Sequence, residues 1–247
     1  MLLPADLILS VFLLGTFVAA IVTGVAGFAF GLVALAIWLQ ALTPLQVAPL
    51  VAAYALLVQG YAVWKLRHAL DWLRLVPFLV GSVLGVPAGI ALLSWVPQGA
   101  LRLGVGVLLI LFSVYSLARP QLQPRREAGW RSDAAVGWLN GVVGGSTGLA
   151  GILVVIWCSL RGWPRDEQRA VFQPTAVVSF VAIILGLGGG GMLSAETARL
   201  FAIGLPALAA GTWLGWSLYG KVDEARFRSI VLVVLLLCGV ALVAAGI

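Results

Sequence analysis

Hydrophobic runs separated by short polar stretches dominate this sequence. The eight longest contain 17 or more residues each and cover 7–40, 47–64, 75–95, 101–118, 134–160, 170–190, 198–218 and 229–246. A helix needs about 20 apolar residues to cross a hydrocarbon core about 30 Å thick, and lipid offers the backbone no hydrogen-bond partner. The runs are also too long and too uniformly apolar for the strands of a membrane barrel. The pattern therefore predicts an all-α integral membrane protein.

The composition agrees with a membrane protein and leaves no segment for a soluble domain. Of the 247 residues, 62% are hydrophobic and 10% are charged, and the mean hydropathy is +1.10. The net charge of +6 does not indicate nucleic-acid binding, because the basic residues lie in short loops, where they act as topology signals. No Lys or Arg precedes the first run, so we expect the N-terminus to be retained rather than cleaved as a signal peptide. Cys158 and Cys238 lie inside hydrophobic runs and imply no disulfide framework.

The sequence repeats itself at about half its length. Residues 22–38, VTGVAGFAFGLVALAIW, align with residues 142–158, VVGGSTGLAGILVVIWC, at an offset of 120. Residues 81–89, GSVLGVPAG, align with residues 208–215, LAAGTWLG, at an offset of 126. Internal repeats are typical of secondary transporters, whose substrate site lies near the middle of the bilayer where the repeats meet.

The distribution of the 15 Lys and Arg residues predicts the topology. If all eight runs cross the membrane, these residues divide 8 to 7 between the two sides, whereas positive residues normally concentrate on the cytoplasmic side. If residues 134–160 instead enter and leave on one side as a re-entrant hairpin, the division becomes 13 to 2, with only Arg102 and Arg199 outside. The loops then predicted to be cytoplasmic are 65–74, 119–133, 161–169 and 219–228.

The first run, 7–40, is expected to form the matching hairpin. Its 34 residues would give a helix roughly 51 Å long, too long for one crossing and too short for two. Because no Lys or Arg lies at its ends, the charge distribution does not decide between a hairpin and a single crossing. With one hairpin and three crossing helices in each half, the second half is inverted relative to the first. The expected domains are a first membrane repeat at 1–118, a basic cytoplasmic linker at 119–133 and a second membrane repeat at 134–247.

Two glycine-rich breaks are the candidate binding elements. Every charged residue can be placed in a loop or at the end of a run, which argues against a carboxylate proton relay inside the membrane. Breaks at 23–31 and 141–151 would instead expose backbone N–H groups at the start of a half-helix, where the helix dipole favours an anion. Two such tips approaching from opposite faces would form a neutral anion site in mid-bilayer. The candidate substrate-binding residues are Thr23, Gly24, Gly27, Phe28, Gly31, Gly144, Gly145, Ser146, Thr147, Gly148 and Gly151.

Some of these residue types carry specific roles. Ser146 and Thr147 would add hydroxyl donors, and Phe28 would shape the pocket. Gln173 and Thr175 flank Pro174 in the sixth run, so they are further site candidates, although they could equally repair the backbone bond that the proline frees.

Packing is the alternative role for the glycines, since small residues let membrane helices approach closely. It stays open for the two breaks, and it is the preferred interpretation for Gly81, Gly85, Gly89, Gly211 and Gly215. The only histidine, His68, lies in a basic loop. Without a histidine pair or an activated nucleophile at membrane depth, we expect no enzyme activity, no metal site and no cofactor.

Several motifs together resemble the TauE/SafE family of sulfite and organosulfonate exporters. They are the glycine-rich opening of each half, RHALDW at 67–72 followed by VGSVLGVPAG, RGWPRDEQRAVF at 161–172, GTWLG, and KVDEARFRSIV. The resemblance covers about residues 10–245. It implies an inner-membrane permease for small sulfur-containing or carboxylate anions. Members of the family typically have a proline soon after each glycine-rich break, whereas this chain has Trp38 and Trp157 nearby and no proline before Pro44 and Pro164.

The preferred interpretation is export of a small anion by alternating access. An uncoupled anion channel, a membrane enzyme and a non-transport membrane subunit are the alternatives, and saturable counterflow would distinguish a carrier from a channel. The coupling ion, the direction and the oligomeric state, a homodimer included, stay open.

Overall fold

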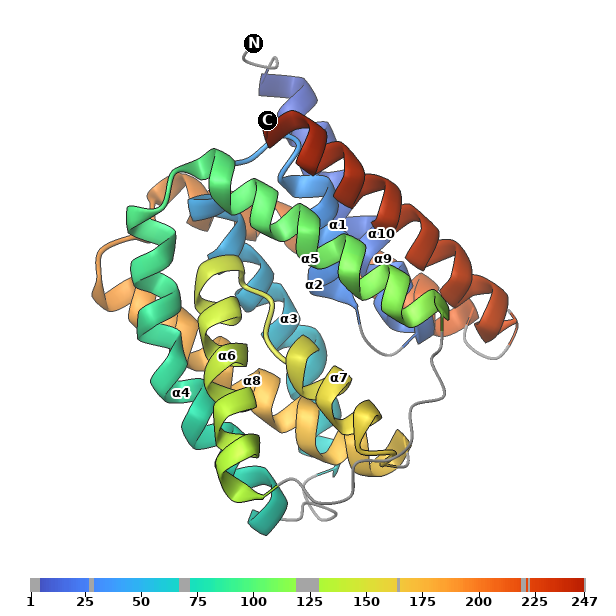
Figure 1. The fold of residues 1–247 in the computed structure, drawn as a ribbon. Helices are drawn as coiled ribbons and strands as arrows, with labels where there is room; N and C mark the ends of the chain where they lie inside the picture. Colours follow the sequence, from blue (N-terminus) through green and yellow to red (C-terminus); the bar gives the residue numbers. More distant parts are fainter. Residues whose placement is uncertain are drawn as a thin grey trace. The chain divides into compact units, whose positions relative to one another are not determined.

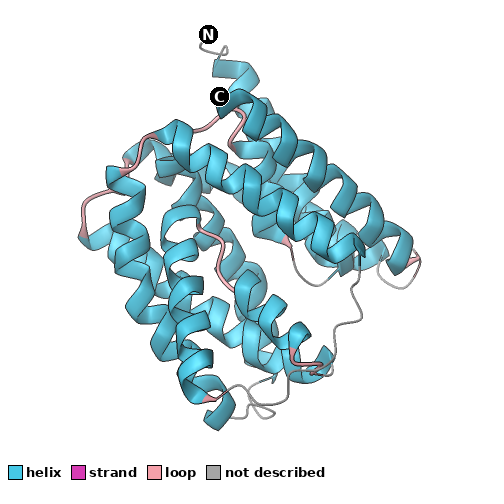
Figure 2. Cartoon of the chain, viewed as in Figure 1, coloured by secondary structure: helices cyan, strands magenta, loops and turns pink. Residues whose placement is uncertain are grey.

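The computed structural model describes residues 5–26, 29–66, 72–118, 129–163, 165–218, 221 and 223–246. Within these ranges the chain forms ten helices and no strand (Figures 1 and 2), which confirms the predicted all-α class. The helices are α1 (Ala5–Ala26), α2 (Phe30–Trp38), α3 (Pro44–Leu66), α4 (Trp72–Trp95), α5 (Gln98–Ala118), α6 (Trp130–Thr147), α7 (Ile152–Leu160), α8 (Arg165–Gly189), α9 (Ala195–Leu218) and α10 (Glu224–Gly246).

The helices are those of a multi-pass membrane protein. Five are long and apolar enough to cross a bilayer, within Asp6–Val25, Trp72–Trp95, Gln98–Ala118, Glu167–Gly189 and Ala195–Leu218. Shorter apolar helices lie at Pro44–Gly60 and Ser229–Ala244.

Both runs predicted to be broken consist of two helices. The first forms α1 and α2, and the fifth forms α6 and α7, so eight runs become ten helices. α2 and α7 have nine residues each, a length of roughly 13.5 Å, about half of a ~30 Å hydrocarbon core. Figure 1 shows the chain turning back between α6 and α7, so these two helices form a hairpin. α6 begins at Trp130, four residues before the predicted start.

The chain divides into two compact units, each containing one broken run. The first unit comprises Met1–Val47, Val96–Pro120 and Ser194–Ile247, and the second comprises Ala48–Trp95 and Gln121–Leu193. Each unit therefore combines helices from both halves of the sequence. In the first unit α9 packs along α1, and in the second α4 packs along α6.

A glycine zipper holds α4 against α6 in the second unit. Three glycines spaced four residues apart on α4 face three with the same spacing on α6. A Cβ added at any of the six would meet the main chain of the partner helix, starting with a carbonyl oxygen. The glycines are Gly81, Gly85 and Gly89 on α4 and Gly137, Gly141 and Gly145 on α6. The structure confirms the packing interpretation of the α4 glycines, because no larger residue allows this approach.

In the first unit, glycines also allow two helices to pack closely, α9 against α1. Gly215 on α9 lies against Gly24 on α1, where an added Cβ would be 2.8 Å from the Gly24 Cα, and Gly211 lies against the Phe17 carbonyl. Trp38 closes α2 onto α1, since its indole N–H donates to the Phe12 carbonyl at 3.1 Å. Packing is therefore also confirmed for the two α9 glycines.

Candidate anion site at the second helix break

The break between α6 and α7 depends on two glycines with a left-handed backbone. Gly148 ends α6 with φ +79° and donates its N–H to the Gly144 carbonyl at 2.7 Å. Gly151 precedes α7 with φ +99°. A side chain at either position would be strained, because L-residues rarely adopt this region. The sequence thus ends one helix and starts the next within four residues.

Free backbone donors lie in the first turn of α7. The first hydrogen bond of this helix runs from the Val155 N–H to the Gly151 carbonyl at 2.9 Å. The N–H groups of Ile152, Leu153 and Val154 therefore have no acceptor within the helix. Ile152 is 8% exposed and Val154 is 0% exposed, and the positive end of the helix dipole lies at these donors, where it favours an anion.

Asn140, which the sequence analysis did not select, fixes the start of α7. Its Oδ1 accepts the Gly151 N–H at 2.8 Å. Its Nδ2 donates to the Ser82 hydroxyl of α4 at 3.3 Å, and that hydroxyl donates to the Gly137 carbonyl at 3.0 Å. Asn140 and Ser82 are both fully buried. An amide side chain in a glycine-rich apolar run was the available signal, since a buried amide needs specific partners.

The hydroxyls predicted as anion donors bond to their own helix. Ser146 Oγ lies 2.9 Å from the Val142 carbonyl, and Thr147 Oγ1 donates to the Val143 carbonyl at 2.6 Å. The Thr147 oxygen also accepts the Leu149 N–H at 3.0 Å. In this conformation both hydroxyls stabilise the end of α6.

α8 lies beside the break. A Cβ added at Gly151 would be 3.1 Å from the Ala176 Cβ and 3.7 Å from the Phe172 carbonyl, so the predicted Gln173–Thr175 segment runs along the start of α7. Thr175 Oγ1 donates to the Val171 carbonyl at 2.8 Å, as expected for local backbone repair. Gln173 is 5% exposed, and its Oε1 has no hydrogen-bond partner. Of the two candidates, Gln173 is therefore the one with a buried polar atom that has no hydrogen-bond partner.

α3 contacts the turn between α6 and α7 at Gly148. At Gly148 an added Cβ would lie 2.5 Å from the Ala48 carbonyl and 2.9 Å from the Val51 Cβ. Gly144 has more room, because the atoms nearest to an added Cβ would be the Ile183 Cδ1 at 3.3 Å and the Ala150 Cβ at 3.4 Å. Gly145, by contrast, faces α4 as part of the glycine zipper.

The first break has similar geometry with different residues. Ala29 precedes α2 with φ 84°, a strained conformation for a residue with a Cβ. Ala29 and Gly151 are 122 residues apart, two more than the offset of 120 found by aligning the glycines. Gly31 lies in the first turn of α2, and Thr23 Oγ1 donates to the Ala19 carbonyl at 2.8 Å.

Of the three other predicted candidates at this break, the structure describes Gly24. Gly24 packs against Gly215 of α9. Gly27 and Phe28 lie outside the described residues.

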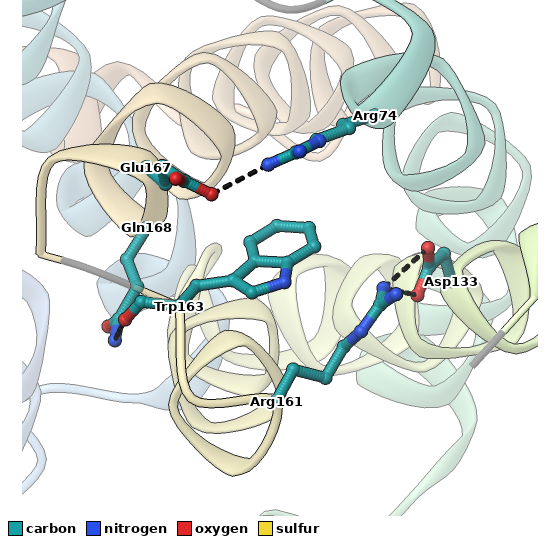
Figure 3. Close-up of polar contacts among 6 residues, drawn as sticks. All are labelled: Arg74, Asp133, Arg161, Trp163, Glu167 and Gln168. Carbon is teal, nitrogen blue, oxygen red and sulfur yellow. Dashed lines mark hydrogen bonds and ion pairs between the residues drawn. The ribbon is translucent and has the colours of Figure 1, made fainter. Parts of the chain in front are cut away.

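A buried ion pair closes the far end of the α6–α7 hairpin (Figure 3). Arg161 Nη1 lies 2.9 Å from both carboxylate oxygens of Asp133, and both side chains are about nine-tenths buried, with exposures of 11% and 10%. The Trp157 indole N–H donates to the same carboxylate at 2.8 Å. Asp133 was assigned to the linker from the sequence, but it lies in the first turn of α6. An acidic residue is favourable there.

A second ion pair and an indole extend this cluster to α4 and α8. Arg74 Nη1 lies 2.6 Å from Glu167 Oε2, and both side chains are about half exposed. The Trp163 ring lies between two guanidinium groups, 4.7 Å from Arg161 Cζ and 5.4 Å from Arg74 Cζ, as Figure 3 shows. The cluster therefore joins one end of α4, α6, α7 and α8.

Comparison with known proteins finds one protein family. The family model described as sulfite exporter TauE/SafE matches residues 11–242. No curated protein and no solved structure matches the chain.

Proposed function

Since the chain belongs to the TauE/SafE family of sulfite exporters, we propose that it carries sulfite or an organosulfonate out of the cell across the inner membrane. The family consists of membrane transporters and not of enzymes. The multi-pass helical architecture agrees with that role.

The first turn of α7 is the observation that best supports this substrate class. Three N–H groups, those of Ile152, Leu153 and Val154, precede the first helical hydrogen bond. Sulfite and sulfonate groups both present three oxygens that accept hydrogen bonds. An anion seated on this turn would gain charge-assisted hydrogen bonds and the favourable end of the helix dipole.

A neutral binding element suits a carrier, which must release its substrate as well as bind it. Alternating access between the two membrane sides is the mechanism we propose, in keeping with the repeated sequence. We further propose the inverted-repeat topology with loops 65–74, 119–133, 161–169 and 219–228 in the cytoplasm. The 13 to 2 division of basic residues and the nine-residue lengths of α2 and α7 support this topology.

Counterflow in proteoliposomes tests the function. Vesicles preloaded with unlabelled sulfite should accumulate radiolabelled sulfite transiently, with saturable kinetics and with competition by taurine, sulfoacetate, sulfate and acetate in an order that defines the substrate class. Linear, non-saturating flux without counterflow would indicate a channel instead.

A proline in the first turn of α7 tests the site. Leu153→Pro removes one N–H that has no acceptor within the helix, and proline is tolerated in a first turn. Leu153→Ala is the matched control, because it shortens the side chain and keeps the N–H. A hydrogen bond to a charged group contributes about 1.5–3 kcal/mol, so sulfite should bind roughly 10- to 100-fold more weakly to the proline variant than to the alanine variant. Equal affinities would remove this N–H from the site.

A further inference from the structure

Asn140 is the side chain that connects the two arms of the α6–α7 hairpin at the candidate site. It reaches from α6 to the residue that precedes α7, with its Oδ1 2.8 Å from the Gly151 nitrogen. It is fully buried, so this bond is not exchanged for one to water. This amide therefore holds the first turn of α7 beside α6.

The orientation of the amide is determined by its partners. The Gly151 N–H can only donate, so the atom facing it must be the carbonyl oxygen. The Ser82 hydroxyl gives its proton to the Gly137 carbonyl, so it must accept the hydrogen bond from Asn140 Nδ2. The three bonds run in one direction, and a flipped amide would break two of them.

We propose that Asn140 determines the anion affinity of this break by accepting a helix-terminal N–H with a neutral oxygen. This inference rests on the proposed function. An aspartate has the same shape and could accept the same N–H, but it would place a full negative charge at the start of α7. That charge would neutralise the end of the helix dipole and repel the substrate. The neutral amide holds the turn in place. It does not weaken the electrostatic attraction between the start of α7 and the anion.

The charged groups near this hairpin leave Asn140 in a neutral environment. Asp133, the acid nearest to it on α6, lies seven residues earlier and is paired with Arg161. Other described titratable side chains on α6 and on the helices around it lie toward that same end of the hairpin, and they are Arg74, Arg131, Cys158, Glu167 and Arg169. On α3 the described titratable side chain is Tyr54, which is fully buried.

Asn140→Asp tests the proposal with a sulfonate, whose charge is constant over the range from about pH 5 to about pH 8. At pH 8 the variant should bind the sulfonate on the order of 100-fold more weakly, because a carboxylate about one helical turn from the anion repels it in a medium of low dielectric constant. At any pH low enough to protonate the carboxyl, the affinity should return toward that of the unchanged protein. The maximal counterflow rate should change little.

Two comparisons make the result decisive. Ser82→Ala removes the hydrogen-bond partner of Asn140 without adding charge, so it should weaken binding less than tenfold and equally at every pH. Reconstitution of the aspartate variant at low pH favours its protonated form and allows the assay even if the charged form folds poorly.

The possible failures are distinguishable. An aspartate variant that binds the sulfonate normally at pH 8, or that loses no more affinity there than Ser82→Ala, would overturn the role of Asn140 while the proposed function stands. Absence of sulfonate and sulfite binding by the unchanged protein would overturn the proposed function and this inference with it.

Discussion

Gly145 and Gly144 are adjacent glycines with opposite structural constraints, and replacing each by alanine tests the packing of the second unit. At Gly145 an added Cβ would lie 2.5 Å from the Val86 carbonyl oxygen and 2.9 Å from the Gly89 Cα and the Ile90 nitrogen. Ordinary contacts begin at 3.4 Å, so α4 and α6 would have to separate by about 0.9 Å. These neighbours are main-chain atoms, which cannot rotate away.

The expected cost follows from two opposing effects. Overpacking of this kind costs about 1–3 kcal/mol, and a contact with rigid backbone belongs at the upper end. Alanine gains about 1 kcal/mol over glycine in a helix, so Gly145→Ala should destabilise the protein by about 2 kcal/mol. At Gly144 the nearest atom is the Ile183 Cδ1 at 3.3 Å, which can move, so Gly144→Ala should be neutral or slightly stabilising.

Thermal stability in detergent measures the difference. Aliquots of each variant are heated and the remaining monodisperse protein is quantified by size-exclusion chromatography. Gly145→Ala should lower the midpoint by about 4–8 °C, and Gly144→Ala should leave it unchanged. Gly104→Ala on α5, where an added Cβ meets nothing within 4 Å, is a second control. Equal stability of the Gly144 and Gly145 variants would refute the close approach of α4 and α6.

Three further predictions concern the ion pair, the topology and the site. Asp133→Asn keeps the shape of the side chain but removes the carboxylate charge that pairs with the buried Arg161, so it should destabilise by about 3 kcal/mol or more. Glu167→Gln in the half-exposed pair should cost less than about 1 kcal/mol. Chemical unfolding of both variants compares them. A cysteine at position 165 should react with a membrane-impermeant maleimide only from the cytoplasmic side, and labelling from outside would contradict the second hairpin. Gln173→Leu removes a buried oxygen without a partner, so it should leave thermal stability equal or higher while weakening sulfite binding in the counterflow assay; unchanged binding would exclude this side chain from the site.

The sequence alone predicted the helical class, the breaks and one face of the glycine zipper. Run length and composition determine whether a segment is helical in lipid, and both can be read directly. The zipper glycines on α4 were recognisable from their four-residue spacing, because that spacing places them on one helix face.

Other features depend on how helices are rotated and paired, which the sequence does not show. Gly144 and Gly145 are the same residue type, yet about 100° of helix rotation separates an accommodating environment from a backbone contact. Ala29 has a left-handed backbone that nothing in its residue type indicates. The role of Asn140 cannot be derived from the sequence alone, because its partner Gly151 is eleven residues away and its other partner, Ser82, is on a different helix.

The contacts of the α6–α7 hairpin imply that the candidate site is formed before substrate arrives. Asn140 fixes the start of α7 at one end, the buried Asp133–Arg161 pair fixes its finish at the other, and the zipper holds α6 to α4 over six glycines. Because both of the contacts between α6 and the ends of α7 are buried, moving α7 relative to α6 would break the Asn140 hydrogen bond and the Asp133–Arg161 pair together. Binding at the proposed site would therefore require little ordering of the donors, which would raise the affinity without adding charge. A transport cycle that preserves this geometry would move the hairpin together with α4 and not α7 alone.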